Sequence, residues 1–315
     1  GTAGLHVIVN ALGIGVGDEV LVPSFTFAAS ANVVFYEGAT PIFVDIEPDT
    51  FTLDPDDVRA KITAHTKAIM TVDVFGHPVL WDEILAIADE YGLAIIDDCC
   101  EALGSEYKGT PIGKLGDAGC FAFYPNKQIT TGEGGVIVTD SDEIARITRS
   151  LRNQGRGEMG AWLEHERLGY NYRIDEMSAA LGISQLARLE TFINKREQVA
   201  QLYNQHLASL DWLHVPLVRD DVRVSRFVYV VLLAEGLDRN PVMAALADRG
   251  IPTRAYFSPL HVQPYIQKRM GDLRGTLSIT ENIASRTIAL PFHNNFSEDH
   301  VKTVVDALAE VVALA

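Results

Sequence analysis

The first part of the chain alternates short apolar runs with segments whose apolar residues recur every three or four positions. The short runs predict strands at 19–24, 40–46, 67–73, 93–98, 119–123 and 135–140, and the periodic segments predict helices such as 54–62 and 80–92. Strands that are apolar on both faces and alternate with helices are typical of a mainly parallel sheet covered on both sides. The pattern therefore predicts an α/β fold, in which ligands bind at the carboxyl ends of the strands.

The pattern changes after residue 140. It predicts a helix at 142–152, one long amphipathic helix at 175–209, and then a strand at 226–234 followed by helices at 240–250 and 297–315. A long helix after a large sheet often leads into a second domain. We therefore predict a large domain at 1–210 and a smaller C-terminal α+β domain at 211–315.

Composition limits the function classes. The chain has 315 residues, of which 47% are apolar and 22% charged, so it is globular, and no apolar run is long enough to cross a membrane. Its net charge of −16 repels nucleic-acid phosphates, so we expect no nucleic-acid partner. Cys99, Cys100 and Cys120 lie in apolar stretches without zinc-site spacing. We expect no metal site, and buried thiols in a reducing cytoplasm.

Lys127 is the first candidate for chemistry. It lies in a connection between two apolar strands, and a glycine-rich run at 132–135 follows it. Burial lowers the pKa of a lysine amine, which favours nucleophilic attack and Schiff-base formation near neutral pH. A solvated surface lysine is the alternative that this segment alone leaves open.

Asp97 and Asp98 end the strand predicted at 93–98. Neighbouring strand residues point to opposite faces, so only one of the two should face a ligand. A carboxylate at this position can keep the ring nitrogen of pyridoxal phosphate protonated, as the chemistry of that cofactor requires. A cap or turn role for the two aspartates is the alternative.

Two weaker signals lie nearer the N-terminus. The turn Gly1-Thr2-Ala3 opens a helical pattern, and its backbone N–H groups and hydroxyl suit a phosphate. Phe27 follows a strand end and can stack on a planar ring, although a buried aromatic is the alternative.

Several segments together carry a family resemblance that runs over almost the whole chain. They include GDEVLVPSFTFAASANVV, IIDDCCEALGSEYKG, FYPNKQITTGEGG, LGYNYRIDEMSAALGISQL and GIPTRAYFSPLHVQPY. In this order they resemble the DegT/DnrJ/EryC1/StrS family of sugar aminotransferases, which use pyridoxal phosphate. The resemblance implies the fold of type I transferases that depend on this cofactor. It also makes Lys127 the Schiff-base lysine, Asp98 the partner of the ring nitrogen and Phe27 the residue that stacks on the ring.

The resemblance implies a shared active site as well. Thr2 and Ala3 are expected to bind the cofactor's phosphate, together with Asn171, which the family supplies from the neighbouring subunit. The chain is therefore expected to form a homodimer.

Three features depart from the family pattern. Ala122 stands where a phosphate-binding Ser is usual, so one hydroxyl contact is missing. Glu101 stands where Gln or His lies near the cofactor's phenolic oxygen. Family members also begin a few tens of residues before the Gly-Thr-Ala turn, so we expect an N-terminal segment to be absent here.

The resemblance implies an activity. Glutamate is the expected amino donor, and the expected acceptor is a nucleotide-linked keto-sugar. We expect the 4-keto-6-deoxy type, because Glu101 in the segment EALGSEYKG resembles the residue found there in enzymes that aminate carbon 4. A Glu101 that only reflects shared ancestry or serves the local hydrogen-bond network is the alternative. The dehydratase branch of the family carries His in place of the lysine, so Lys127 argues against it. A cofactor-binding regulator without turnover is the alternative from another class.

Overall fold

A computed structural model describes residues 1–157 and 164–313. A six-stranded sheet forms the centre of the first part of the chain, with the order β2-β1-β3-β4-β7-β8. Neighbours from β2 to β7 run parallel, and β8 pairs antiparallel with β7. The strands are β1 (Glu19–Pro23), β2 (Thr40–Val44), β3 (Thr66–Val72), β4 (Ala94–Asp98), β7 (Ala118–Ala122) and β8 (Gly135–Val138). The six predicted strands are confirmed to within about two residues at each end.

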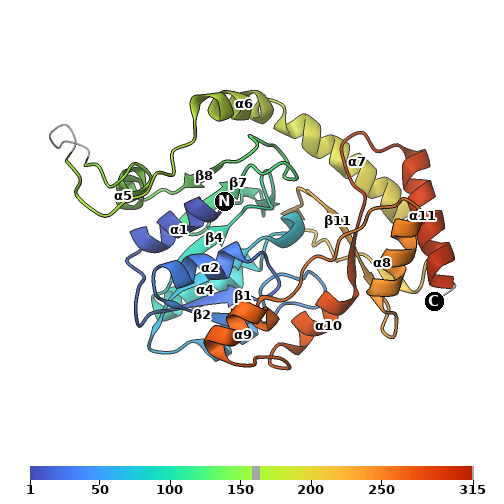
Figure 1. Ribbon diagram of the computed structural model, residues 1–315, viewed down its shortest axis with the longest axis horizontal. Coiled ribbons are helices and arrows are strands. Elements are labelled where there is room, and N and C mark those ends of the chain that lie inside the picture. The colour runs from blue at the N-terminus through green and yellow to red at the C-terminus, as the bar shows by residue number, and fades with distance from the viewer. Residues whose placement is uncertain (158–163, 314–315) are drawn as a thin grey trace.

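Helices cover both faces of this sheet (Figure 1). On one face, the apolar side chains of the strands pack with α1 (Thr2–Ala11), α2 (Ala29–Tyr36) and α5 (Asp142–Arg152). On the other face they pack with α3 (Pro55–Lys61) and α4 (Trp81–Tyr91). The expected α/β fold is confirmed, because strands buried on both faces leave only their ends open to ligands.

The long helix predicted at 175–209 is wrong as a single element. The structure has α6 (Glu176–Leu186) and α7 (Leu189–Leu207), which run in different directions (Figure 1). The apolar side chains of the two helices face different surroundings: α6 buries none of its residues, whereas α7 buries Ile193, Val199 and Tyr203 among others. A break between them lets α7 pack inward while α6 stays at the surface.

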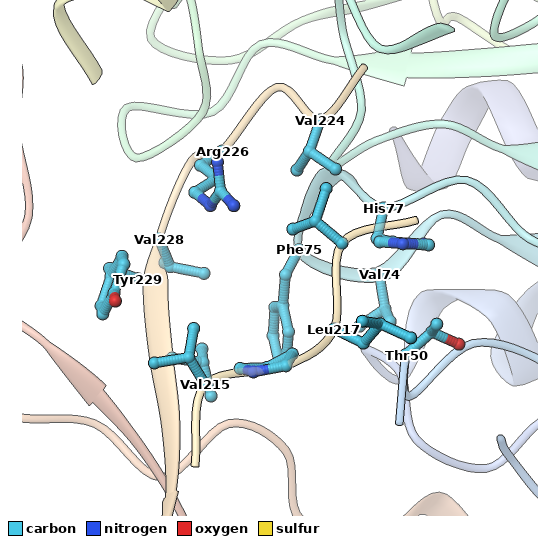
Figure 2. A pocket seen from close by; sticks show the side chains of 13 residues that line it. Thr50, Val74, Phe75, His77, Val215, Leu217, Val224, Arg226, Val228 and Tyr229 are labelled. Atoms are coloured by element: carbon cyan, nitrogen blue, oxygen red, sulfur yellow. The ribbon is translucent and has the colours of Figure 1, made fainter. Parts of the chain in front are cut away.

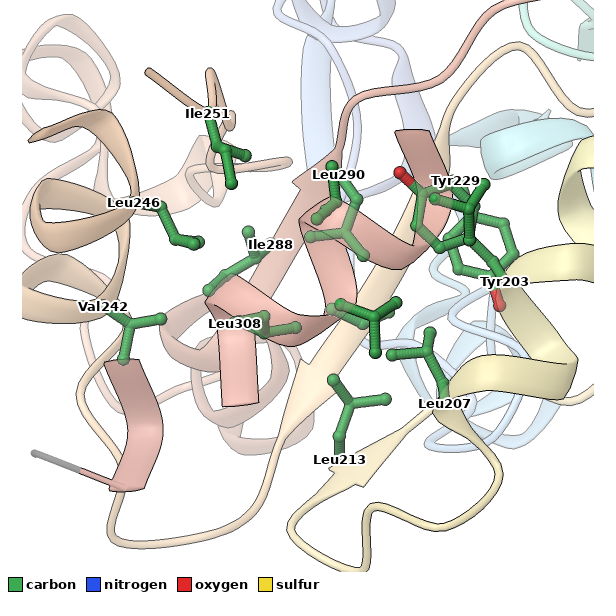
Figure 3. Packing of buried hydrophobic residues seen from close by; sticks show 14 of the residues in the cluster. Tyr203, Leu207, Leu213, Tyr229, Val242, Leu246, Ile251, Ile288, Leu290 and Leu308 are labelled. Atoms are coloured by element: carbon green, nitrogen blue, oxygen red, sulfur yellow. The ribbon is translucent and has the colours of Figure 1, made fainter. Parts of the chain in front are cut away.

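The C-terminal part has its own antiparallel sheet, with the order β12-β11-β9. Its strands are β9 (Leu213–His214), β11 (Tyr229–Leu233) and β12 (Thr287–Leu290), and α7, α8 (Arg239–Asp248) and α11 (Glu298–Ala313) pack against it. Figure 3 shows this core, in which Tyr203 stacks on Tyr229 with ring centroids 4.6 Å apart. The apolar core of the C-terminal part also contains residues of α7, which precede residue 210. The domain boundary at residue 210 therefore stays a prediction.

The remaining elements connect the two parts. They are η1 (Val74–Gly76), η2 (Leu260–Val262), α9 (Pro264–Met270), α10 (Ser278–Arg286) and the small sheet of β5 (Glu106–Tyr107), β6 (Thr110–Pro111) and β10 (Val222–Arg223). One apolar cluster joins Phe25 and Phe75 with Phe257, and these rings meet edge to face or stacked. None of the described helices has the length and apolar character needed to cross a bilayer.

Candidate active site

The end of β4 separates its two aspartates onto opposite faces of the sheet. Ile95 packs in the cluster with α3 and α4, and Ile96 packs in the cluster with α1 and α2. Because side chains alternate along a strand, Asp97 lies on the first of these faces and Asp98 on the second. Asp98 is 5% exposed, and its carboxylate accepts hydrogen bonds from Ser30 Oγ at 2.8 Å and from the backbone N–H of Cys100 at 3.2 Å.

Lys127 forms a buried ion pair with Glu101. Its Nζ donates to Glu101 Oε1 at 3.3 Å, and it also lies 4.3 Å from the centre of the Phe227 ring. The second carboxylate oxygen of Glu101 accepts a hydrogen bond from the backbone N–H of Phe75 at 2.9 Å. The side chains of Lys127 and Glu101 are only 14% and 8% exposed, so the alternative of a solvated surface lysine is wrong.

Electrostatics around this pair differ from the expectation for a lone buried lysine. Burial lowers the pKa of Lys127, but the nearby Glu101, Cys100 and Asp98 raise it by more, so the pKa lies above its ordinary value. For the carboxyl of Glu101, burial has the opposite effect and raises the pKa, although Lys127 and the Phe75 N–H oppose that rise. The expected lowering of the lysine pKa is therefore not observed, because a carboxylate accompanies the amine into the interior.

Asp97 belongs to a different group on the opposite face. It accepts hydrogen bonds from Thr71 Oγ1 at 3.1 Å and from the Gly113 N–H at 3.0 Å. It also lies close to Asp73 and Cys99, and the carboxylate oxygens and the sulfur of these three residues, atoms of the kind that can bind a metal ion, are within 4.8 Å of one another. Burial raises the pKa of Asp97 to about 6 and the pKa of Asp73 well above its ordinary value. Two carboxyls this close share a proton rather than both ionise. This accounts for Asp73 Oδ2, which is buried and has no hydrogen-bond partner among the described residues.

The Gly-Thr-Ala turn lies beside the ends of β4 and β7. A Cβ added at Gly1 would meet Cys100 Sγ at 2.9 Å and Ala122 Cβ at 3.0 Å, so a larger residue would displace the turn. Thr2 and Ala3 form the first turn of α1, whose N-terminus has no side-chain cap. The free N–H groups of this turn therefore lie at the same sheet edge as Asp98, as a phosphate site requires.

Phe27 and Asn171 occupy surface positions. Phe27 lies between β1 and α2 and is 64% exposed, so the alternative of a buried core aromatic is wrong. Asn171 pairs through its backbone with Asn153, and its side chain is exposed. Among the described residues, no hydrogen bond joins Asn171 to Lys127, Asp98 or Glu101, so within one chain the structure does not bring it into this cluster.

Two cavities differ greatly in size. The larger, of about 960 Å³, lies between α1, β8, α5 and residues 172–175, and Thr2 and Ala3 contribute to its wall. The smaller, of about 40 Å³, lies among residues of η1, 215–218 and 224–230, and Phe75 is one of the side chains that line it (Figure 2). It has room for a few water molecules at most, so the site for a substrate does not lie there.

Four hydrogen bonds around the Lys127 segment have no counterpart in the sequence pattern. Gln128 donates from Nε2 to the backbone oxygens of Glu101 at 2.6 Å and Ser225 at 2.7 Å. Arg196 of α7 donates to the backbone oxygens of Phe227 at 2.8 Å and Lys127 at 3.4 Å. These bonds tie the lysine segment to α7 and to the start of the C-terminal part. No local motif marks them, because the partners lie about 27 to 97 residues apart in the chain.

The cysteines are free thiols. Cys99 and Cys120 are buried as expected, whereas Cys100 is half-buried, because it lies beyond the end of β4 and next to the Gly1 turn. Its Sγ donates to the backbone oxygen of Cys120.

Comparisons with known proteins agree with this arrangement. The profile of the DegT/DnrJ/EryC1/StrS aminotransferase family matches residues 1–309. GDP-perosamine synthase of Caulobacter vibrioides is 41% identical over 317 residues, which span 99% of this chain and 84% of that protein. The crystal structure of a DegT DnrJ EryC1 StrS aminotransferase from Brucella abortus superimposes with a TM-score of 0.91 at 34% identity, over 98% of this chain and 83% of that one. Spr1654 from Streptococcus pneumoniae, solved in its PLP form, gives 0.92 at 27% identity, over 99% and 85%.

Proposed function

Because the chain belongs to the DegT/DnrJ/EryC1/StrS aminotransferase family and is thus a sugar aminotransferase dependent on pyridoxal phosphate, we propose that it transfers an amino group from glutamate to a nucleotide-linked 4-keto-6-deoxy sugar. One observation supports the site best: Lys127 pairs with Glu101, three residues after Asp98, and the first turn of α1 lies beside the ends of β4 and β7. The name GDP-perosamine synthase of a 41% identical relative supports a nucleotide-linked acceptor.

The residues present fit pyridoxal phosphate. Lys127 supplies a primary amine for the cofactor's aldehyde, and Asp98 supplies a carboxylate for its ring nitrogen. Thr2 and Ala3 offer a hydroxyl and helix N-terminal N–H groups to its phosphate, and the exposed ring of Phe27 suits its planar face. We propose these roles on the chemistry of the donors, which together match each part of the cofactor.

The reaction assigns different work to each side chain. When bound, pyridoxal phosphate supplies an electron sink for the substrate carbon that gains or loses the amine. Lys127 Nζ, in its uncharged form, would move the proton between this carbon and the cofactor. Asp98 would pair with the protonated ring nitrogen, and Glu101, 3.3 Å from Lys127 Nζ, would balance the charge of the amine whenever the amine carries the proton.

The position of amination is the finest part of the proposal. Glu101 lies 3.3 Å from Lys127 Nζ, so it is close enough to influence groups that the lysine reaches. We propose carbon 4 because the residues around Glu101 resemble those of enzymes that aminate carbon 4. The test offers glutamate with a panel of nucleotide-linked 3-keto and 4-keto sugars, and nuclear magnetic resonance locates the nitrogen in the product. Nitrogen on carbon 3 refutes this part of the proposal. The Lys127→Ala variant is the control for amination that does not depend on the proposed catalytic lysine.

We also propose a homodimer with shared active sites. The surface of α6 exposes large apolar side chains, among them Met177 at 83%, Ile183 at 73% and Leu186 at 55%. Apolar side chains exposed together are typical of a surface that another protein covers. Asn171 is exposed just before this helix, so a second copy that covers α6 could receive it near its own phosphate-binding turn.

Complementation tests the shared site. Lys127→Ala and Asn171→Ala chains are each expected to be inactive, and a mixture should regain activity, because one of the two sites in each hybrid dimer contains both native residues. Absence of rescue, in a mixture where mass spectrometry shows that subunits have exchanged, refutes the sharing. Each variant assayed alone, at the same total protein concentration, is the control.

A further inference from the structure

The carboxylate of Asp98 is held by a hydroxyl from another helix. Ser30, in the first turn of α2, donates from Oγ to Asp98 Oδ2 at 2.8 Å. Ser30 is 0% exposed, so water does not compete for this bond. The other oxygen, Oδ1, accepts only the longer bond from the Cys100 N–H at 3.2 Å among the described residues. The Ser30 bond is therefore the shorter of the two that orient this carboxylate.

A second hydroxyl supports the bond from Ser30 to Asp98. Thr26 Oγ1 lies 3.1 Å from Ser30 Oγ, and Thr26 is also buried. A hydroxyl has one proton, and an ionised carboxylate can only accept, so the proton of Ser30 points to Asp98. The Thr26 hydroxyl must then donate to Ser30. Thr26 and Ser30 thus form a relay of two hydroxyls, in which Thr26 donates to Ser30 and Ser30 donates to Asp98.

The relay belongs to the segment that carries Phe27. The Ser30 N–H donates to the backbone oxygen of Phe27 at 3.3 Å, so the turn that presents this exposed ring also positions the hydroxyl. The same short segment thus places an aromatic ring and orients a carboxylate. Asp97, on the opposite face, accepts from Thr71 and lies in the group with Asp73 instead.

We propose that Ser30, supported by Thr26, is a positioning residue that keeps Asp98 charged and aimed at the cofactor's ring nitrogen. The proposal rests on the role of Asp98 in the proposed function. Hydrogen bonds to the charged form of a carboxyl stabilise that form. Without the Ser30 bond, the buried carboxylate keeps only the longer bond from the Cys100 N–H, and the proton it shares with the ring nitrogen moves toward the carboxylate.

The experiment loads the protein with pyridoxal phosphate labelled with ¹⁵N in the ring and follows the nitrogen chemical shift as the pH rises. In Ser30→Ala the ring nitrogen should lose its proton about one pH unit lower than in the native protein, and the half-reaction with glutamate should slow about tenfold, since hydrogen bonds to charged groups have this strength. Thr26→Val, which removes only the second hydroxyl, should shift the midpoint in the same direction by less.

Two further variants separate the possible explanations. Ser150→Ala removes another buried serine hydroxyl, on α5, and should leave both the midpoint and the rate unchanged. Asp98→Asn should shift the midpoint further than Ser30→Ala does. A slower rate in Ser30→Ala with an unchanged midpoint means that the serine is merely structural, and this overturns the relay while the proposed function stands. An unchanged midpoint in Asp98→Asn overturns both the relay and the proposed role of Asp98.

Discussion

Replacement of Asp98 by Asn tests the assignment of faces at the end of β4. The change keeps the shape of the side chain and removes its charge. Asp98 is 5% exposed, so little water is available to replace the lost charge. Removal of one preorganised electrostatic contact at an active site costs about 3–4 kcal/mol of barrier, which corresponds to a rate about 10²–10³ times lower. The fold should suffer little, because the Ser30 hydroxyl can turn to accept from the new amide.

Asp97→Asn is the matched control, one residue away on the other face. Its amide oxygen can still accept from the Gly113 N–H, but its NH₂ group then replaces the oxygen that accepts from Thr71. We expect a loss of about 1–3 kcal/mol in the free energy of unfolding. The rate of the half-reaction should stay within about threefold of the native rate, since this is less than 1 kcal/mol of barrier.

Two measurements distinguish the variants. Stopped-flow absorbance follows the reaction of the loaded enzyme with glutamate in a single turnover, and urea unfolding gives the stability of each variant. The reasoning predicts a slow but stable Asp98→Asn and a fast but less stable Asp97→Asn. The reverse result, in which Asp97→Asn abolishes the half-reaction and Asp98→Asn is mild, would show that the cofactor faces the other side of the sheet.

Two more predictions concern the cluster of Lys127 and Glu101, and a third concerns the group of Asp73 and Asp97 on the opposite face. Borohydride reduction of the loaded protein should fix the cofactor on Lys127, and peptide mapping that finds it on another lysine contradicts the assignment. Glu101→Gln removes the main influence that raises the pKa of Lys127, so the pH midpoint for loading the cofactor, followed by absorbance, should fall. An unchanged midpoint means that Glu101 does not control the amine. Burial raises the pKa of Asp73 and of Asp97 (to about 6), so the folded protein holds these protons more tightly than the unfolded chain. Stability should therefore fall as the pH rises from about 4 through 6 and above, by up to about 1.4 kcal/mol per pH unit for each proton. Asp73→Asn, which resembles the protonated acid, should flatten this fall in urea unfolding measured at several pH values, and an equally steep fall in the variant contradicts a shared proton.

The sequence by itself determined the large sheet and the position of Lys127 between two of its strands. Apolar runs bounded by turn residues specify strands locally, so the predicted β1 to β4, β7 and β8 agree with the structure. The prediction of one helix at 175–209 was wrong, because a continuous helical spacing of apolar residues does not show where the apolar face changes direction. The structure breaks this segment after Leu186 and leaves α6 at the surface.

The residue pattern left both aspartates open and the family resemblance favoured Asp98, but only the tertiary structure shows what surrounds each of them. Alternation along a strand places Asp97 and Asp98 on opposite faces, but it does not say which helices cover each face. That depends on how α1 and α2 pack, and their packing brings Ser30 to Asp98 across 68 positions of the chain. The pKa of Lys127 depended on folding in the same way, because Glu101 joins it from 26 residues away. Contacts between distant residues form only when the chain folds, and a local pattern therefore contains no sign of them.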